Sequence, residues 1–194
     1  MHPLALFRYC PKCGSPHFEE NNFKSKKCAT CGFTYYFNSS AAVAVFITDP
    51  EGRLLVAKRA KEPAKGALDL PGGFVDLNET GEEAVRREVL EETGLVIHTI
   101  NYLFSLPNIY TYSGFDVHTL YLFYRCEIDH LSGLRAADDV EELFFLPEHE
   151  IRPELFGLDS IREGVKIFFS PRTLSHAPIN AYKKTTSICL EYQK

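Results

Sequence analysis

Three glutamates spaced three and four residues apart are the part of this sequence best suited to chemistry. Glu88, Glu91 and Glu92 lie in the run REVLEETGL, and on a helix their side chains would share one face. Crowded carboxylates repel one another unless a cation lies between them. Mg²⁺ and Mn²⁺ prefer oxygen ligands, so this face suits a divalent cation. The alternative is a solvated acidic helix face with ion pairs within the helix, the commoner meaning of such a run.

A glycine-rich turn before the glutamates favours a ligand site over a solvated face. The turn LPGG covers residues 70–73, where the backbone can approach a ligand closely. Thr80 and Glu83 have the spacing of a capping box that begins a helix, and Gly94 stands where the helix would end. The sequence therefore predicts a loop followed by a helix, between Thr80 and Gly94, that carries the acidic face.

An arginine within the acidic run could hold a carboxylate in position. At helical spacing, Arg87 can reach Glu83 on one side and Glu91 on the other. We expect it to orient a carboxylate without taking part in the chemistry.

The stretch 73–95 resembles the Nudix box, because all nine fixed positions of that motif are present at the right spacing: Gly73, Glu79, Arg87, Glu88, Val89, Glu91, Glu92, Gly94 and Leu95. The resemblance implies that the three glutamates bind Mg²⁺ or Mn²⁺ with help from the Gly73 carbonyl. It also implies that Arg87 orients a glutamate and that Glu79 supports the geometry between loop and helix.

The chemistry implied by this resemblance is metal-assisted hydrolysis of a diphosphate bond. The catalytic residues would be Glu88, Arg87, Glu91 and Glu92. The general base is left open between Glu88 and an acid of a later loop. The loop acids available are Asp139, Glu141 and Glu142.

Four cysteines near the start of the chain form a second strong motif. Cys10 and Cys13 are followed after fourteen residues by Cys28 and Cys31, and each pair precedes a glycine that allows a tight turn. Four thiolates at this spacing predict a tetrahedral structural zinc site. Two disulfides are the alternative, which a secreted protein would favour. Of the other two cysteines, Cys126 is expected in the core and Cys189 is assigned no role.

Substrate contacts are expected from one cation and three aromatic side chains. Arg59 ends an apolar strand just before the glycine-rich turn, where it could bind phosphates, with simple solvation as an equal alternative. Lys61 and Lys65 in the following loop are expected to be solvated. Tyr110, Tyr112 and Phe115 could stack on a nucleobase. Core packing or a dimer contact would explain these three rings about as well.

The elements that must position these residues follow from hydrophobic periodicity. The segments 41–48 and 53–59 predict a hairpin of buried strands joined by the turn DPEG. Strands are also expected at 96–106, 115–128 and 143–146, an exposed loop at 107–114, and a closing helix at 158–169. This order predicts an α/β class protein, an α/β/α sandwich around a mixed sheet, and the Nudix resemblance over about residues 41–169 implies the same fold.

With the four-cysteine ribbon in front, the chain resembles the zinc-ribbon Nudix group that includes the NADH pyrophosphatases. It departs from that group's signature SQPWPFPxS, of which Ser105 and Pro107 are present and Tyr110 replaces a phenylalanine. The proline typical of ADP-ribose hydrolases is replaced by the same Tyr110. Tyr112 lies where dinucleoside polyphosphate hydrolases tend to carry a tyrosine.

Composition agrees with an enzyme of modest size. The 194 residues are 45% hydrophobic and 24% charged, which supports one buried domain and a small appendage. We expect a zinc ribbon at 1–37, a Nudix domain at 38–170 and a tail at 171–194. A net charge of −5 argues against a general nucleic-acid binder, and no apolar run approaches membrane-spanning length. A cytoplasmic location is expected, since no secretory leader is evident.

The function expected from these features is hydrolysis of the diphosphate linkage in a nucleoside diphosphate derivative such as NADH or ADP-ribose. The alternative is a nucleotide sensor, or an RNA-binding or cap-processing protein that uses the ribbon and its Lys24, Lys26 and Lys27. Because every box glutamate is kept, the enzyme is favoured. The ribbon is then expected to be a structural element or one that forms a homodimer.

Overall fold

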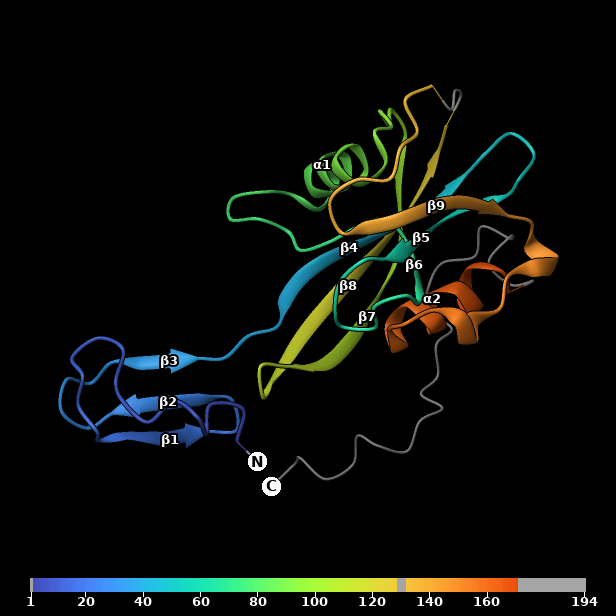
Figure 1. The fold of residues 1–194 in the computed structure, drawn as a ribbon. Helices are drawn as coiled ribbons and strands as arrows, with labels where there is room; N and C mark the ends of the chain where they lie inside the picture. Colours follow the sequence, from blue (N-terminus) through green and yellow to red (C-terminus); the bar gives the residue numbers. More distant parts are fainter. Residues whose placement is uncertain (1, 129–131, 171–194) are drawn as a thin grey trace.

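The computed structural model describes residues 2–128 and 132–170, which form two sheets (Figure 1). The small N-terminal sheet is antiparallel, with the strand order β1-β2-β3. Its strands are β1 (Phe18–Asn22), β2 (Ser25–Cys28) and β3 (Thr34–Tyr36). The first CxxC pair lies in the turn before β1, and the second begins at Cys28, the last residue of β2, and continues into the turn that follows.

The larger sheet has six strands and is mixed, because β4 and β8 run parallel while the other pairs are antiparallel. Its order is β6-β5-β4-β8-β7, and β9 pairs with β5. The strands are β4 (Ser40–Thr48), β5 (Leu54–Arg59), β6 (Leu68–Asp69), β7 (Ile100–Tyr112), β8 (Phe115–Glu127) and β9 (Val140–Leu146).

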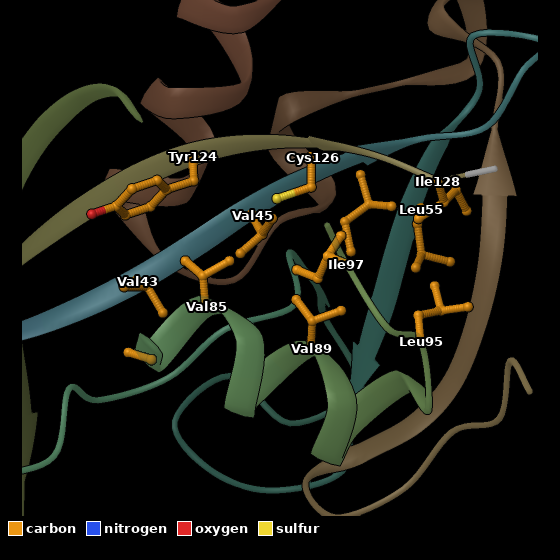
Figure 2. Close-up of a cluster of buried hydrophobic side chains, with 12 residues drawn as sticks. Val43, Val45, Leu55, Val85, Val89, Leu95, Ile97, Tyr124, Cys126 and Ile128 are labelled. Atoms are coloured by element: carbon orange, nitrogen blue, oxygen red, sulfur yellow. The ribbon is translucent and has the colours of Figure 1, made fainter. Parts of the chain in front are cut away.

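Two helices cover opposite faces of this sheet, so the expected α/β/α sandwich is confirmed. The helix α1 (Gly81–Thr93) packs Val85 and Val89 against Val43 and Val45 of β4 (Figure 2). The alternate residues of β4 pack with the second helix, α2 (Asp159–Phe168), which follows the short 3-10 helices η1 (Glu148–Glu150) and η2 (Pro153–Leu155). Because both faces of β4 are covered, the strand reads as an uninterrupted apolar run.

The expected hairpin of β4 and β5 is present only at its turn. The two strands are adjacent and antiparallel, but in the described structure their ladder joins only Thr48 to Leu54. Along most of its length β4 pairs with β8, and β5 pairs with β9. Strand periodicity reveals that a segment is buried on both faces, but it does not reveal which neighbour lies beside it.

The expectation of an exposed loop at 107–114 is wrong. Strand β7 continues through Pro107 to Tyr112, and a tight turn at Ser113 and Gly114, both with positive φ, joins it to β8. Proline lacks a backbone N–H, but β7 is the edge strand of its sheet, where that loss is tolerated. The strand that was expected at 96–106 also begins later than predicted, at Ile100.

Aromatic rings join the small sheet to the tip of the β7–β8 hairpin. Phe115 packs edge-on against Phe37 and Phe7, with ring centroids 5.5 and 5.8 Å apart. His118 lies 5.5 Å from the Phe37 ring. The N-terminal part of the chain, which contains the four cysteines and the strands β1–β3 and is called the four-cysteine unit below, therefore contacts the hairpin that also carries Tyr110 and Tyr112.

None of the helices in the described part of the chain is long and apolar enough to cross a membrane. Cys126 is fully buried in the core beside α1, as expected (Figure 2). The expected tail at 171–194, including Cys189, lies outside the described residues.

Candidate active site

The helix α1 begins and ends as its sequence predicts. The Thr80 hydroxyl accepts a hydrogen bond from the Glu83 backbone N–H at 3.2 Å, and the Glu83 carboxylate accepts one from the Thr80 N–H at 2.8 Å. Gly94 adopts the left-handed conformation that ends the helix, with φ of 72°. These local signals fix the rotation of the helix start, and with it the direction of the acidic face.

Glu92 is buried against the glycine-rich turn. Its Oε2 accepts a hydrogen bond from the Gly72 N–H at 2.9 Å, and the residue is only 8% exposed. Burial raises the pKa of Glu92 to about 8, and the charges of Glu88 and Asp69 act in the same direction. A cation bound beside a buried carboxyl group stabilises its ionised form.

Glu88 fills the space that the missing side chain of Gly73 leaves open. A Cβ atom at Gly73 would lie 2.5 Å from Glu88 Oε1, so the glycine is required for close contact. Burial raises the pKa of Glu88, while the neighbouring Arg87 opposes the shift. The Gly73 carbonyl already accepts a hydrogen bond from the Val43 N–H at 2.8 Å, and its second lone pair remains for another partner.

Arg87 holds the acidic face in one arrangement. It donates to both oxygens of Glu79 at 2.8 Å, to Glu88 at 2.7 Å and to Glu91 at 3.3 Å. The expected contact with Glu91 is therefore present. The expected contact with Glu83 is not among its bonds, because that carboxylate accepts from Thr80 in the capping box. Hydrogen bonding to Arg87 lowers the pKa of Glu79.

The three glutamates supply the oxygen donors that Mg²⁺ and Mn²⁺ prefer, with Glu88 and Glu92 buried and Glu91 half exposed. They do not form a closed cage, since in the described residues only the four cysteines bring three or more ligand atoms within 4.8 Å of one another. Mg²⁺ is commonly bound by one or two carboxylates together with substrate phosphates. The carboxylate oxygens of the three glutamates thus fit a cation whose remaining ligands come from a bound substrate.

A cavity of about 490 Å³ opens beside Glu92 and the glycine-rich turn. This volume falls within the usual range for small-molecule sites. The side chains that line it and could contact a ligand include Arg59, Asp69, Glu92, Tyr110, Tyr112, Tyr121 and Asp139. Of the three glutamates Glu88, Glu91 and Glu92, only Glu92 lines the cavity, which connects it to the tyrosines of the β7–β8 hairpin.

Most of the predicted substrate-binding residues line this cavity. Arg59, Tyr110 and Tyr112 do so, whereas Phe115 does not, because it packs against the N-terminal sheet. Arg59 is itself engaged: it forms an ion pair with Asp69 and donates to the Pro63 carbonyl at 2.6 Å.

The later loop acids differ in their surroundings. Asp139 lines the cavity and forms an ion pair with Lys61, while Glu141 pairs with Lys58 at 2.9 Å outside it. Glu142 is exposed.

Sequence reasoning missed three residues that belong to this region. Asp69 is buried beneath Arg59, and burial raises its pKa. The second is Tyr121 of β8, which lines the cavity. The third is Asp138, whose negative charge contributes to raising the pKa values of both Glu88 and Glu92. No motif marks these residues, since long-range packing alone places them near α1.

The four N-terminal cysteines converge as predicted. The Sγ atoms of Cys10 and Cys31, and those of Cys13 and Cys28, are 3.7 Å apart. A tetrahedral zinc ion with bonds near 2.3 Å requires sulfurs about 3.8 Å apart. Hydrogen bonds from the backbone of Cys31 and Thr30 lower the pKa of Cys28 to about 6, whereas, against a backbone hydrogen bond from Ser15, the neighbouring thiols and burial raise the pKa of Cys13. The fit of the cluster to a structural metal ion therefore rests on the sulfur positions.

Comparison with known proteins matches the larger unit to one family. The family model described as "NUDIX domain" matches residues 38–164. Among curated relatives, the ADP-ribose pyrophosphatase of Methanocaldococcus jannaschii is 37% identical over 130 residues, which cover 66% of this chain and 74% of that protein. The NAD-capped RNA hydrolase NudC of Vibrio parahaemolyticus is 32% identical over 106 residues, 55% of this chain. The aligned part spans only 40% of that NudC protein.

Solved structures share the fold. A NUDIX hydrolase from Nitrosomonas europaea superposes with a TM-score of 0.64 at 23% identity, covering 83% of this chain and 89% of that one. The NUDIX domain of Shewanella oneidensis NrtR, solved with ADP ribose, gives a TM-score of 0.56 at 18% identity, covering 68% and 86% of the two chains. At these identities the likeness concerns the fold alone.

Proposed function

Because this chain belongs to the NUDIX family, we propose that it is a metal-dependent pyrophosphohydrolase. It cleaves the diphosphate linkage of a nucleoside diphosphate derivative and releases a nucleoside monophosphate. The observation that carries the proposal is the cavity that joins Glu92 and the glycine-rich turn to Arg59 and the tyrosines. A diphosphate at the acidic end would place an attached nucleoside at the aromatic end.

Glu88, Glu91 and Glu92 are proposed to hold Mg²⁺ or Mn²⁺ beside the Gly73 carbonyl. When bound, such cations offset phosphate charge and activate water for attack on phosphorus. Arg87 fixes the direction of Glu88 through its bonds to Glu79. The protein thus prepares its carboxylates before substrate arrives, which lowers the cost of ordering them during reaction.

Arg59 is proposed to contact a substrate phosphate from the cavity wall. Its ion pair with Asp69 holds the guanidinium at the cavity and leaves other N–H groups for the ligand. For the general base we propose Glu88 or Asp139. Asp139 is favoured over Glu141 and Glu142 because it alone of these three loop acids lines the cavity.

ADP-ribose is proposed as the substrate to test first. The relative named for that activity shares 37% identity, and the match covers 74% of its length. The NudC relatives suggest a second candidate, NAD-capped RNA, although the chain matches only two fifths of their length. The four cysteines are proposed to hold a structural Zn²⁺, which supplies stability that the small N-terminal sheet lacks in its own core.

A product assay tests the proposed reaction. The purified chain is incubated with Mg²⁺ or Mn²⁺ and, separately, with ADP-ribose, NADH, diadenosine polyphosphates, nucleoside triphosphates or NAD-capped RNA. We expect AMP from ADP-ribose or NADH, resolved by chromatography. If no substrate is turned over with either metal while nucleotides still bind, the enzyme proposal fails and a nucleotide sensor replaces it.

A further inference from the structure

Tyr121 of β8 presents an unpaired hydroxyl to the active-site cavity. Its ring packs against the core cluster beneath α2 and lies 6.1 Å from the Phe123 ring, so the side chain is held in place. No described residue forms a hydrogen bond with its hydroxyl, and this oxygen is not among the unpaired polar atoms that are sealed from solvent. Because Tyr121 lines the cavity, its hydroxyl is available to a ligand there.

The charged groups around this hydroxyl all belong to the cavity. The charges of Asp69, Arg59 and Glu92 act on the Tyr121 hydroxyl, and all three residues line the same cavity. Glu92 is part of the proposed metal site, and Arg59 is the proposed phosphate contact. Tyr110 also lies near Arg59, but the charge of Glu92 is not among those that act on it. The Tyr121 hydroxyl is therefore near both groups that would hold a diphosphate.

The chemistry of the hydroxyl suits a phosphate oxygen. An ionised phosphate oxygen accepts hydrogen bonds, whereas the carboxylates of Asp69 and Glu92 are also acceptors when ionised and cannot donate to it. A tyrosine hydroxyl is a neutral donor at pH values well below its ordinary pKa of about 10, and burial together with the charge of Asp69 raises the pKa of Tyr121 further. Tyr121 thus supplies a donor beside Arg59 without adding charge.

We propose that Tyr121 is a substrate-binding residue whose hydroxyl donates a hydrogen bond to an oxygen of the substrate diphosphate, beside Arg59. The rings of Tyr110 and Tyr112 are then left for the nucleoside at the other end of the cavity. This role rests on the proposed function for the identity of the ligand as a diphosphate, but it concerns binding and needs no turnover.

The test measures binding of ADP-ribose by calorimetry without added divalent metal ions, together with competition by inorganic pyrophosphate, which carries a diphosphate and no nucleoside. Tyr121→Phe keeps the ring and removes only the hydroxyl. It should bind ADP-ribose about tenfold more weakly, as expected for one lost hydrogen bond to a charged group. Pyrophosphate should lose the same factor, because the lost contact is to the part that both ligands share.

A matched control is Tyr102→Phe, which makes the same chemical change on the neighbouring strand β7. Tyr102 is half exposed, packs edge-on against Tyr124 with ring centroids 5.6 Å apart, and does not line the cavity. This control should keep wild-type binding of both ligands. The melting temperature of the ligand-free Tyr121→Phe protein should be unchanged or raised, because the hydroxyl that it removes has no partner among the described residues.

Three results would overturn the role of Tyr121. The first is Tyr121→Phe that binds both ligands like wild type. The second is a variant that loses affinity for ADP-ribose alone, because the hydroxyl would then contact the nucleoside or the ribose. The third is a wild-type chain that binds neither ligand.

Turnover separates this failure from that of the proposed function. A chain that hydrolyses ADP-ribose but shows any of these results keeps its function and loses the Tyr121 contact. A chain in which Tyr121→Phe weakens both ligands equally, but which hydrolyses nothing, keeps the diphosphate site and loses the proposed reaction.

Discussion

Glu91 and Glu92 are neighbours in the chain but lie in different surroundings. The Glu91 side chain is 49% exposed and bonds only weakly to Arg87, whereas Glu92 is buried and accepts a bond from Gly72. A buried carboxylate is costly to ionise, and its negative form is favoured when a cation binds. We therefore expect Glu92 to matter more for metal binding than for folding.

Glu92→Gln tests this assignment. The amide keeps the size of the side chain and can still accept from Gly72, but it removes the charge that a cation requires. Turnover should fall at least about a hundredfold at saturating Mg²⁺, with the melting temperature unchanged or raised. Steady-state kinetics and calorimetry measure the two effects. The exposed Glu154→Gln serves as a matched control, and a variant rate within twofold of wild type would contradict the metal assignment.

Sequence reasoning succeeded for site residues whose geometry is local. The helix period places Glu88, Glu91 and Glu92 together, and the capping signals around Thr80 are contained within a few residues. It failed for Phe115, whose position depends on the N-terminal sheet packing against the hairpin. Asp69 was missed for the same reason, since its proximity to Glu92 arises from sheet topology.

At the scale of elements, the glycine-rich turn and α1 form one unit. The turn contacts the helix through the Gly72 N–H and through the space that Gly73 leaves for Glu88. The turn also pairs with β4 through the Gly73 carbonyl and the Val43 N–H. A small change in the turn must therefore move a carboxylate.

Gly73→Ala should damage catalysis more than folding. Its Cβ would overlap the Glu88 carboxylate, and the end of a glutamate side chain can move away at low cost to the fold. We expect kcat to fall at least about tenfold, since small displacements of catalytic groups have large effects, while the melting temperature falls by a few degrees. Activity and thermal melts measured on one preparation test this. A collapse of stability together with normal activity per folded molecule would contradict the expected contact.

The elements themselves were predictable where periodicity and capping are strong. The core strand β4 and both helices follow their patterns, because each buries a continuous apolar face. The stretch at 107–114 was misassigned because its proline, polar residues and serine-glycine pair suggest a loop. Only its place at the sheet edge, a property of the whole sheet, permits a strand there.

At the scale of the whole molecule, the four-cysteine unit and the catalytic domain meet at the hairpin tip (Figure 1). The same hairpin carries Tyr110 and Tyr112 in the cavity wall. Composition and cysteine spacing predicted both units, but this contact was not predictable, since it joins residues far apart in the sequence. The expected location in the cytoplasm, the division at residue 37 and a homodimer remain predictions.

Cys28→Ser tests the zinc site. Loss of one thiolate should lower the zinc content below one ion per chain and reduce thermal stability, because metal binding contributes to folding of such small units. Elemental analysis and thermal melts report the two effects. Cys126→Ala is the matched control, since it removes a buried cysteine outside the cluster and should leave zinc content unchanged. Unaltered zinc stoichiometry in Cys28→Ser would refute the four-cysteine site.

The ring contact between the two units can be measured directly. In a double-mutant cycle of Phe37→Ala and Phe115→Ala, the free energies of unfolding should show a coupling of about 0.5–1.5 kcal/mol, as found for aromatic pairs. Denaturant titrations of the four proteins supply the data. Strictly additive losses would mean that the two rings do not stabilise each other in solution.

The edge position of β7 also bears on how the protein avoids aggregation. An exposed strand of thirteen residues with Ile109 and Tyr112 on its surface is a template on which another chain could form a β-ladder. Proline in an edge strand turns its N side to solvent, so Pro107 removes one donor from that template. The register shift between Tyr102 and Phe104 bends the same edge. Pro107, one of the residues that suggested a loop in the sequence, thus makes pairing of this edge with another chain less favourable.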